Sequence, residues 1–249
     1  LAPSEMCIRD RYQSRHGMVV DKLTTREARK LEPALSPAIN GAVRIDGDHQ
    51  VQPRLFTRAL LDACRSAHVT FTTDRIDSLD QLDNADQVVV ANGLGAQKLI
   101  PTLDLRPVYG DVLHVRVPKH QYPLLTRVVR GFVEDRPVYL IPREDGTLTI
   151  GATTREDGRD QPQVQGIHQL LRDAIELVPA LEECDFVEAT AGARPGTPDD
   201  LPYLGRVDER TVVSTGYFRH GILLAGLGAR VGAELVDRHE PSIDLSACD

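Results

Sequence analysis

The sequence predicts an α/β fold: a helix-flanked parallel sheet, interrupted by a domain built on an antiparallel sheet. The apolar run over 88–91 is continuous, which is typical of a strand covered on both faces, and it leads through Gly93 into a predicted helix. Residues 113–117 instead alternate between apolar and polar side chains, as a half-exposed antiparallel strand does. The continuous pattern returns over 211–214, so we expect the parallel sheet to resume after the inserted domain.

The chain before residue 100 alternates between strand and helix signals. A short helix is predicted between Thr24 or Thr25, either of which can cap it, and Pro33, which ends it. Pro53 stands at a favourable first position for a second helix, whose apolar face is formed by Leu55, Ala59, Leu60 and Ala63. The other elements predicted here are strands over 41–48, 69–72 and 86–91 and a helix over 96–100.

The middle of the chain has the pattern of a β-hairpin followed by a helix. Strands are predicted over 137–142 and 147–151, joined by the turn sequence Arg-Glu-Asp-Gly. A helix is predicted over 167–178, where apolar residues recur every three or four positions until Pro179 ends the pattern. A buried helix rich in Leu, Ala and Gly is predicted over 222–237.

The composition argues against several classes of function. Lys+Arg 29 and Asp+Glu 37 give a net charge of 29 − 37 = −8, which disfavours a nucleic-acid-binding protein or a partner of anionic membranes. No apolar run approaches the about 20 residues of a membrane span. The 4 cysteines and 8 histidines are scattered without CxxC or HExxH spacing, so we expect no metal site, no disulfide framework and a cytoplasmic location.

The opening of the chain has an unusual sequence. Residues 4–11, Ser-Glu-Met-Cys-Ile-Arg-Asp-Arg, resemble a translated sequencing adapter, and the alternative is a natural, poorly ordered N-terminus. Residues 1–15 are rich in charge and have no apolar core, so a secretory signal is not expected. We expect 1–17 to be a non-native or disordered start and the chain to be a fragment.

Two segments near the C-terminus have the chemistry of a ligand site. Arg194 precedes a Pro-Gly-Thr-Pro turn, so we expect its side chain to start from a stiff loop. An arginine on such a rigid base can bind a carboxylate through two parallel hydrogen bonds; a structural arginine is the alternative. Residues 216–221 join a predicted strand to a predicted helix. The helix dipole there favours negative charge, and the glycines allow a flat ligand to approach; a crossover turn without a ligand is the alternative.

Other chemistries have weaker support in the sequence. Ser214 lacks the GxSxG sequence of a hydrolase nucleophile. His220 has the chemistry of a general base, but we interpret it as a residue that orients its loop. Asp199 and Asp200 lie in a proline-rich turn, where adjacent carboxylates are usually solvated.

The chain also contains five short motifs in a recognisable order: Ala91-Asn92-Gly93, Tyr139-Leu140-Ile141-Pro142-Arg143, Gly151-Ala152-Thr153-Thr154, Arg194-Pro195-Gly196-Thr197-Pro198-Asp199 and Gly216-Tyr217-Phe218-Arg219-His220-Gly221-Ile222-Leu223-Leu224. Together they resemble the D-amino-acid-oxidase family of FAD-dependent oxidoreductases, and within it the glycine oxidases of thiamine biosynthesis. The resemblance covers about 17–237, and the last two motifs are the most specific.

The resemblance implies a partial FAD-binding, Rossmann-like domain with an inserted antiparallel-sheet substrate domain, and FAD as the cofactor. It also implies oxidative deamination of glycine or a similar small amine-bearing carboxylate to an oxoacid and ammonia, with oxygen reduced to hydrogen peroxide. An amino-acid dehydrogenase, a sarcosine-oxidase-like enzyme and an inactive carboxylate-binding fragment are the alternatives. The sequence leaves open whether the protein is a homo-oligomer.

The same resemblance implies roles for individual residues. Arg194 would pair with the substrate carboxylate, Tyr139 would hydrogen-bond that carboxylate, and Arg219 would lie in the active-site loop. Thr154 would line the substrate site, at a position where glycine oxidases often carry a larger side chain. The expected cofactor-binding residues are Ala91, Gly93, Gly216, Tyr217, Phe218, Arg219, His220, Gly221, Ile222 and Leu223.

The N-terminal fingerprint of such enzymes is missing. They open with a strand and GxGxxG, but Lys98 stands where the third glycine after Gly93 and Gly95 would be, and 226–231 also departs from the pattern. We therefore expect the 249-residue chain to purify colourless and to aggregate. The expected segments are 1–17 as the start, 18–47 and 109–196 as the substrate domain, and 48–108 and 197–249 as the FAD domain.

Overall fold

A computed structural model describes residues 20–248, so the expectations for 1–17 lie outside the described residues. The chain forms two compact units, each assembled from several segments. Unit 1 comprises the described part of Leu1–Gln52 together with Gly110–Thr154 and Gln161–Ala191. Unit 2 comprises Pro53–Tyr109, Arg155–Asp160 and the described part of Gly192–Asp249. The assignment of substrate and cofactor roles to these segments stays a prediction.

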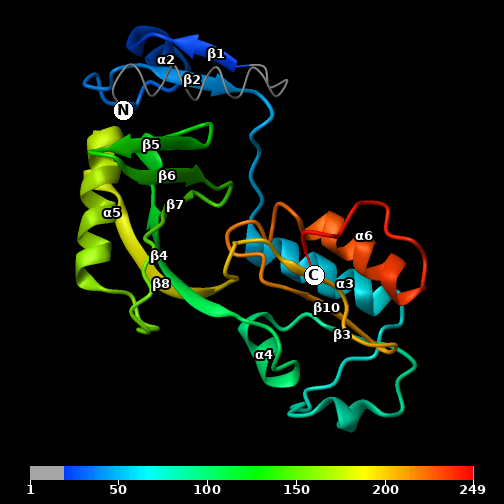
Figure 1. The fold of residues 1–249 in the computed structure, drawn as a ribbon. Coiled ribbons are helices and arrows are strands. Elements are labelled where there is room, and N and C mark those ends of the chain that lie inside the picture. The colour runs from blue at the N-terminus through cyan, green and yellow to red at the C-terminus, as the bar shows by residue number, and fades with distance from the viewer. Residues whose placement is uncertain (1–19, 249) are drawn as a thin grey trace. The chain divides into compact units, whose positions relative to one another are not determined.

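Unit 1 is centred on a five-stranded sheet with the order β5-β6-β7-β4-β8 (Figure 1). The strands are β4 (Arg106–Arg116), β5 (Val129–Val133), β6 (Arg136–Pro142), β7 (Thr147–Gly151) and β8 (Asp185–Gly196). The pairs β5–β6, β6–β7 and β7–β4 are antiparallel, which confirms the predicted hairpin. Strand β4 begins several residues before the predicted strand, and its first residues belong to unit 2.

Helix α5 (Val164–Leu177) packs along one face of this sheet, close to the predicted helix over 167–178 (Figure 1). Because side chains alternate along a strand, Leu140 and Ile150 point to the helix and are buried in the core. Tyr139 pairs with Gly151 and therefore lies on the opposite face. The five-stranded sheet thus has one face that packs against α5 in the core and an opposite face that carries Tyr139.

The N-terminal part of unit 1 adds a two-stranded antiparallel sheet and a short helix. Strand β1 (Val20–Leu23) pairs with β2 (Ala42–Ile45), and helix α2 (Thr25–Leu31) follows β1. Thr24 caps α2 in a capping box with Glu27, which confirms the predicted helix start. Strand β1 was not predicted, because its four residues show no alternation.

The buried carboxylate of Glu32 ties this N-terminal segment to the rest of unit 1. Its oxygens accept hydrogen bonds from the Thr126 N–H at 3.0 Å and from the Thr126 hydroxyl at 2.5 Å. The Arg127 guanidinium lies 3.1 Å away and neutralises its charge. A buried carboxylate needs such partners, and here they come from a segment far along the chain.

Unit 2 contains a three-stranded sheet with the order β3-β10-β9. Strand β3 (Val88–Val90) is parallel to β10 (Thr211–Thr215), and β9 (Tyr203–Arg206) is antiparallel to β10. The parallel pair confirms the α/β prediction. Helix α6 (Ala225–Val236) packs on this sheet, and α4 (Ala96–Leu99) belongs to a small core with β3. Because 221–224 form a turn, α6 starts later than predicted.

Two sequence-based expectations about unit 2 are wrong. Val88 and Val90 are buried, but Val89 is 48% exposed, so the described residues do not cover both faces of β3. Residues 69–72 form no strand, and Val69 and Phe71 are exposed. The predicted helix after Pro53 is present as α3 (Pro53–Ser66), but it buries none of its residues among the described ones. Within 20–248, the short 3₁₀ helices are Leu79–Leu82, Gly93–Gly95, Lys119–Gln121 and Pro179–Glu183.

Candidate functional site

Arg194 lies on strand β8 and not on a loop, which corrects the sequence-based expectation. The strand continues to Gly196, and the turn follows over 198–200. Pro195 does not end the strand, because β8 is at the edge of the sheet and an edge strand tolerates a residue without an N–H. The half-buried Arg194 side chain therefore starts from a strand backbone.

A backbone hydrogen bond joins the Arg194 motif to the glycine-flanked loop after β10. The Phe218 N–H donates to the Pro195 carbonyl oxygen at 3.0 Å. At the end of β10, the Thr215 hydroxyl donates to the Gly93 carbonyl oxygen, also at 3.0 Å. Three motifs that are far apart in the sequence are therefore brought together within unit 2.

Gly216 is required by this arrangement for two independent reasons. Its φ is +77°, a left-handed conformation that other residues rarely adopt. A Cβ added there would stand 2.6 Å from the Thr197 methyl group. Thr197 is itself buried, and its hydroxyl donates to the Leu201 carbonyl oxygen at 2.6 Å. The loop can lie this close to the end of β8 only with glycine at its first position.

The tip of the same loop is exposed and precedes an uncapped helix. Leu223 is 79% exposed and Ile222 is 52% exposed. The Arg219 guanidinium lies 5.4 Å from the centre of the Phe218 ring, within cation–π range. Among the described residues, no side chain caps α6, and its first turn has no acidic residue. The first N–H groups of α6 are therefore not compensated by a side chain, and they favour a negatively charged or electron-rich ligand.

Two residues of the loop have mainly local contacts. The Tyr217 hydroxyl lies 2.8 Å from the Ser214 hydroxyl, and a Cβ added at Gly228 would stand 2.5 Å from that Tyr217 oxygen. The hydroxyl end of the Tyr217 ring thus packs against α6. The backbone of His220 shapes the turn, accepting from the Leu224 N–H and donating to the Tyr217 carbonyl oxygen, both at 2.8 Å.

In unit 1, Tyr139 lies across Gly151 on the face opposite α5. A Cβ added at Gly151 would overlap the Tyr139 phenol, so the glycine leaves room for the ring. Thr154 is exposed at the end of the Gly151-Ala152-Thr153-Thr154 motif. These two residues belong to unit 1, whereas Arg194 and the glycine-flanked loop belong to unit 2.

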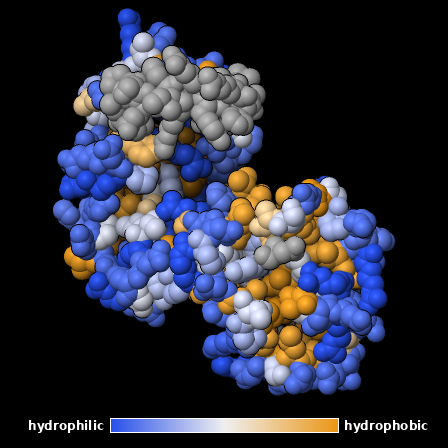
Figure 2. Space-filling model, in the orientation of Figure 1, coloured by the Kyte–Doolittle hydropathy of each residue, from blue (hydrophilic) through white to orange (hydrophobic). Residues whose placement is uncertain are grey.

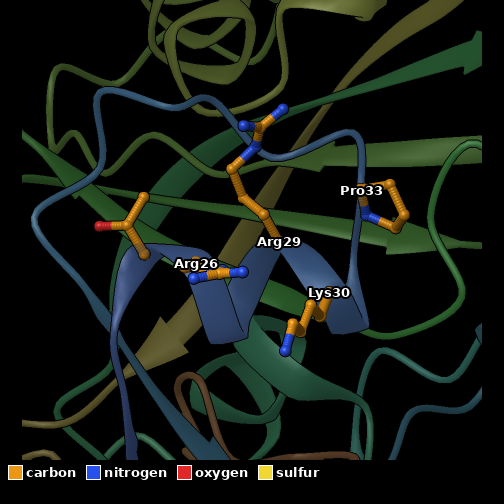
Figure 3. A pocket seen from close by; sticks show the side chains of 5 residues that line it. Arg26, Arg29, Lys30 and Pro33 are labelled. Atoms are coloured by element: carbon orange, nitrogen blue, oxygen red, sulfur yellow. The ribbon is translucent and has the colours of Figure 1, made fainter.

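An open surface pocket of about 520 Å³ lies elsewhere in unit 1, beside α2 (Figure 3). It is lined by Thr25, Arg26, Arg29, Lys30 and Pro33, none of which is a predicted site residue. Within 20–248, no group of three or more His, Cys, Asp or Glu side chains is arranged to hold a metal ion. In the same part of the chain, no helix has both the length and the apolar character of a membrane span.

Comparison with known proteins gives a consistent result. The family model described as "FAD dependent oxidoreductase" matches residues 4–235. The chain is 36% identical over 251 residues to the glycine oxidase of Geobacillus kaustophilus, covering 92% of this chain and 65% of that protein. It is 40% identical over 156 residues to the "Bifunctional protein ThiO/ThiG" of Synechocystis, covering 61% of this chain and 23% of that protein.

The fold agrees with the sequence comparison. The crystal structure of the Geobacillus kaustophilus glycine oxidase superposes with a TM-score of 0.85 and 32% identity, covering 96% of this chain and 68% of that one. The glycine oxidase of Bacillus cereus superposes with a TM-score of 0.79 and 28% identity, covering 95% and 69% of the two chains. The chain thus spans about two thirds of the length of the two glycine oxidases and a smaller share of the bifunctional protein.

Proposed function

Because the chain belongs to the FAD dependent oxidoreductase family, we propose that its protein oxidises glycine or a similar small amine-bearing carboxylate. The substrate loses a hydride and a proton to become an imine, which water hydrolyses to an oxoacid and ammonia. Bound FAD supplies the two-electron acceptor, and oxygen regenerates it with release of hydrogen peroxide. The observation that carries this proposal is the Phe218–Pro195 hydrogen bond. It holds β8, the strand that carries Arg194, against the glycine-flanked loop before α6.

The residues of unit 2 fit one end of the cofactor. Gly93 has a φ of +62°, and a Cβ added there would have no atom within 4 Å, so its backbone faces open space. The loop 216–223 places exposed apolar side chains before the uncapped start of α6. We propose that Gly93 and this loop hold the flavin ring, with the α6 N–H groups stabilising the charge that the ring gains on reduction. Residues 20–248 contain no GxGxxG for the pyrophosphate.

Arg194 is proposed to bind the substrate carboxylate. A guanidinium offers two parallel N–H donors to a carboxylate, and its strand position limits the directions it can take. In unit 1, Tyr139 stays a proposed substrate-site residue that acts through the hydrogen bond its phenol can donate, and Thr154 is proposed to affect which substrate sizes are accepted. Arg219 stays a proposed residue of the active-site loop, where it lies over the Phe218 ring.

The proposal is tested with a fusion of this chain to the part of the Geobacillus kaustophilus glycine oxidase that the chain does not span. We expect the fusion to retain FAD and to release hydrogen peroxide from glycine. Turnover only with an artificial electron acceptor would identify a dehydrogenase instead. A preference for N-methylglycine would identify a sarcosine-oxidase-like enzyme. A flavin-loaded fusion that oxidises none of a panel of small amines would contradict the proposal.

Two further parts of the proposal concern the cell and the assembly. The cytoplasmic location rests on the scattered cysteines of the sequence. A homo-oligomer is compatible with the proposed activity, and light scattering on the purified fusion measures its mass directly.

A further inference from the structure

Arg106, at the start of β4, binds the turn that follows Arg194. Its Nη1 group donates to the Thr197 carbonyl oxygen, and its Nη2 group donates to the Asp200 carboxylate at 2.9 Å. Its Nε atom lies 3.5 Å from the Glu156 carboxylate. All of these residues belong to unit 2, so one guanidinium holds together three segments that are distant in the sequence.

The Arg106 side chain also lies directly over Gly196, the last residue of β8. A Cβ added at Gly196 would stand 3.0 Å from Nη1 and 3.2 Å from both Cγ and Cζ of Arg106. Gly196 is buried, and its missing side chain is what allows the guanidinium to lie flat against the strand end. Arg106 thus contacts the backbone two residues beyond Arg194.

The end of β8 and the turn after it, which Arg106 binds, also contact the glycine-flanked loop. The methyl group of Thr197 packs against Gly216, and the Pro195 carbonyl oxygen accepts from Phe218. The Thr197 carbonyl oxygen, which Arg106 binds, also accepts from the Asp200 N–H at 3.3 Å and closes the turn. Displacement of this carbonyl group would therefore shift the turn, the end of β8 and the Thr197 methyl group that packs against Gly216.

We propose that Arg106 is a positioning residue that sets the direction of Arg194 through Gly196 and Thr197. This proposal rests on the proposed function, in which Arg194 binds the substrate carboxylate. A guanidinium forms two parallel hydrogen bonds to a carboxylate only when the two groups lie in one plane. A small rotation of the end of β8 therefore strongly weakens the binding of the substrate carboxylate by Arg194. Arg106 itself is expected to touch neither substrate nor cofactor.

The test compares variants of the flavin-loaded fusion by steady-state kinetics on glycine and by calorimetric titration with acetate, a carboxylate that cannot react. We expect Arg106→Ala to raise KM and the acetate Kd about tenfold while kcat changes less than about threefold. Arg106→Lys should recover part of the loss, because one ammonium can reach the Thr197 carbonyl or the Asp200 carboxylate but not both. Gly196→Ala should raise both values in the same direction but by less, since its Cβ would push the same guanidinium aside only slightly.

A double-mutant cycle separates positioning from general damage. If Arg106 acts through Arg194, Arg106→Ala should add less than about twofold to KM in an Arg194→Ala background. Arg75→Ala is the matched control, because Arg75 forms a 2.8 Å pair with Asp77 in unit 2 but contacts no part of this turn. It should leave KM and the acetate Kd unchanged.

Several results would overturn the proposal. One is an unchanged glycine KM in both Arg106→Ala and Gly196→Ala. Another is an Arg106→Ala variant that melts at a lower temperature but binds acetate as the wild type does. The third is a double variant whose rise in KM equals the product of the rises in the Arg106→Ala and Arg194→Ala variants. Wild-type fusion that binds acetate but does not oxidise glycine would contradict the proposed function alone. Wild-type fusion that does not bind acetate would contradict the carboxylate role of Arg194, and the positioning role with it.

Discussion

Helix α5 in unit 1 and helix α3 in unit 2 are both amphipathic, but only α5 buries residues of its apolar face among the described residues. In unit 1 the sheet and α5 enclose Leu113, Leu140 and Leu170, which are at most 2% exposed. In unit 2, α3 has an apolar face of the same chemistry, yet Leu55 and Leu60 on it are 60% and 50% exposed. Figure 2 shows hydrophobic residues at the surface of this part of the molecule.

This difference shows that an amphipathic sequence pattern predicts a helix with an apolar face but not the surface that covers it. The period of α3 correctly predicts a helix with one apolar face, and the period of α5 does the same. Only for α5 do the described residues also supply the surface that covers this face. A contiguous exposed apolar face of this kind marks a surface that binds another segment or another protein. The pattern predicts that a face is buried in the functional protein, and it does not predict by what.

The largest expected effect concerns unit 2 as a whole. We expect the 249-residue chain alone to purify without the visible absorbance of flavin, to aggregate, and to show no oxidase activity with added FAD. The fusion to the remaining part of the Geobacillus kaustophilus enzyme should be yellow and soluble, because we expect that part to bind the pyrophosphate, as the family resemblance implies, and to cover apolar surface. Absorbance spectra and size-exclusion profiles of the two proteins test this directly. A soluble, yellow 249-residue chain would contradict it.

A pair of matched leucine variants tests the contrast between the two units. Leu140→Ala removes a side chain with no exposure in unit 1 and should lower the free energy of unfolding by about 2–5 kcal/mol. Leu60→Ala removes an equal volume from the half-exposed face of α3 and should change it by less than about 0.5 kcal/mol. Both are measured by urea denaturation of the 249-residue chain, at a protein concentration low enough to prevent its aggregation. Equal losses in the two variants would show that α3 is buried in solution.

The next effect concerns the proposed substrate anchor. Arg194→Ala in the active fusion should remove a charge-assisted bidentate contact and lower kcat/KM for glycine by about 30- to 1000-fold, or about 2–4 kcal/mol. Arg194→Lys should restore only part of this, because an ammonium lacks the planar fork. Steady-state kinetics decide the matter. An alanine variant with unchanged kcat/KM would remove Arg194 from the site.

The smallest effect concerns an ion pair inside unit 1. Asp173 on α5 is 1% exposed and accepts from Arg136 at 2.9 and 3.0 Å and from Arg172 at 3.0 Å. Burial acts to raise the pKa of the Asp173 carboxyl, but the two guanidinium groups outweigh it and hold that pKa below its usual value. Asp173→Asn should therefore lower the free energy of unfolding at neutral pH by about 1.5–3 kcal/mol.

The pH dependence of this loss follows from the direction of the shift. A carboxyl whose pKa is lowered in the folded state contributes stability above its unfolded pKa of about 3.9 and loses it as the pH falls through the folded value. The difference between wild type and Asp173→Asn should thus be constant near neutrality and shrink below about pH 4. Denaturation curves from neutral to acidic pH measure it. A constant difference over that range would contradict the role of the Asp173 charge.

Local sequence patterns predicted much of the fold. The hairpin β6–β7 and helix α5 were found because a turn signal and a helical period are each contained within a few consecutive residues. The membership of β3 and β10 in a parallel sheet was predicted from their continuous apolar character, but their pairing with each other was not. The strand expected over 69–72 was wrong, since four residues with β-forming side chains form a strand only if a partner strand is available.

The site could be predicted only in part. The motifs around Arg194 and Gly216 were visible in the sequence, but nothing local showed that Phe218 binds Pro195 or that Arg194 stands on a strand. Arg106 was missed altogether, because its partner Thr197 lies 91 residues further along the chain. Single-sequence patterns carry no information about contacts over such distances, and it is these contacts that orient the functional side chains.

The segmented build of the two units also has a consequence for synthesis on the ribosome. Strand β3 pairs with β10, and the partners Val90 and Val213 are separated by 213 − 90 = 123 residues. At a synthesis rate of roughly 5–20 residues per second, about 6–25 seconds pass between the synthesis of β3 and that of its partner strand. The antiparallel strands of unit 1 emerge during this interval and can pair with their neighbours within microseconds. We expect unit 1 to fold first, while the newly made β3 edge depends on chaperones until translation reaches residue 215.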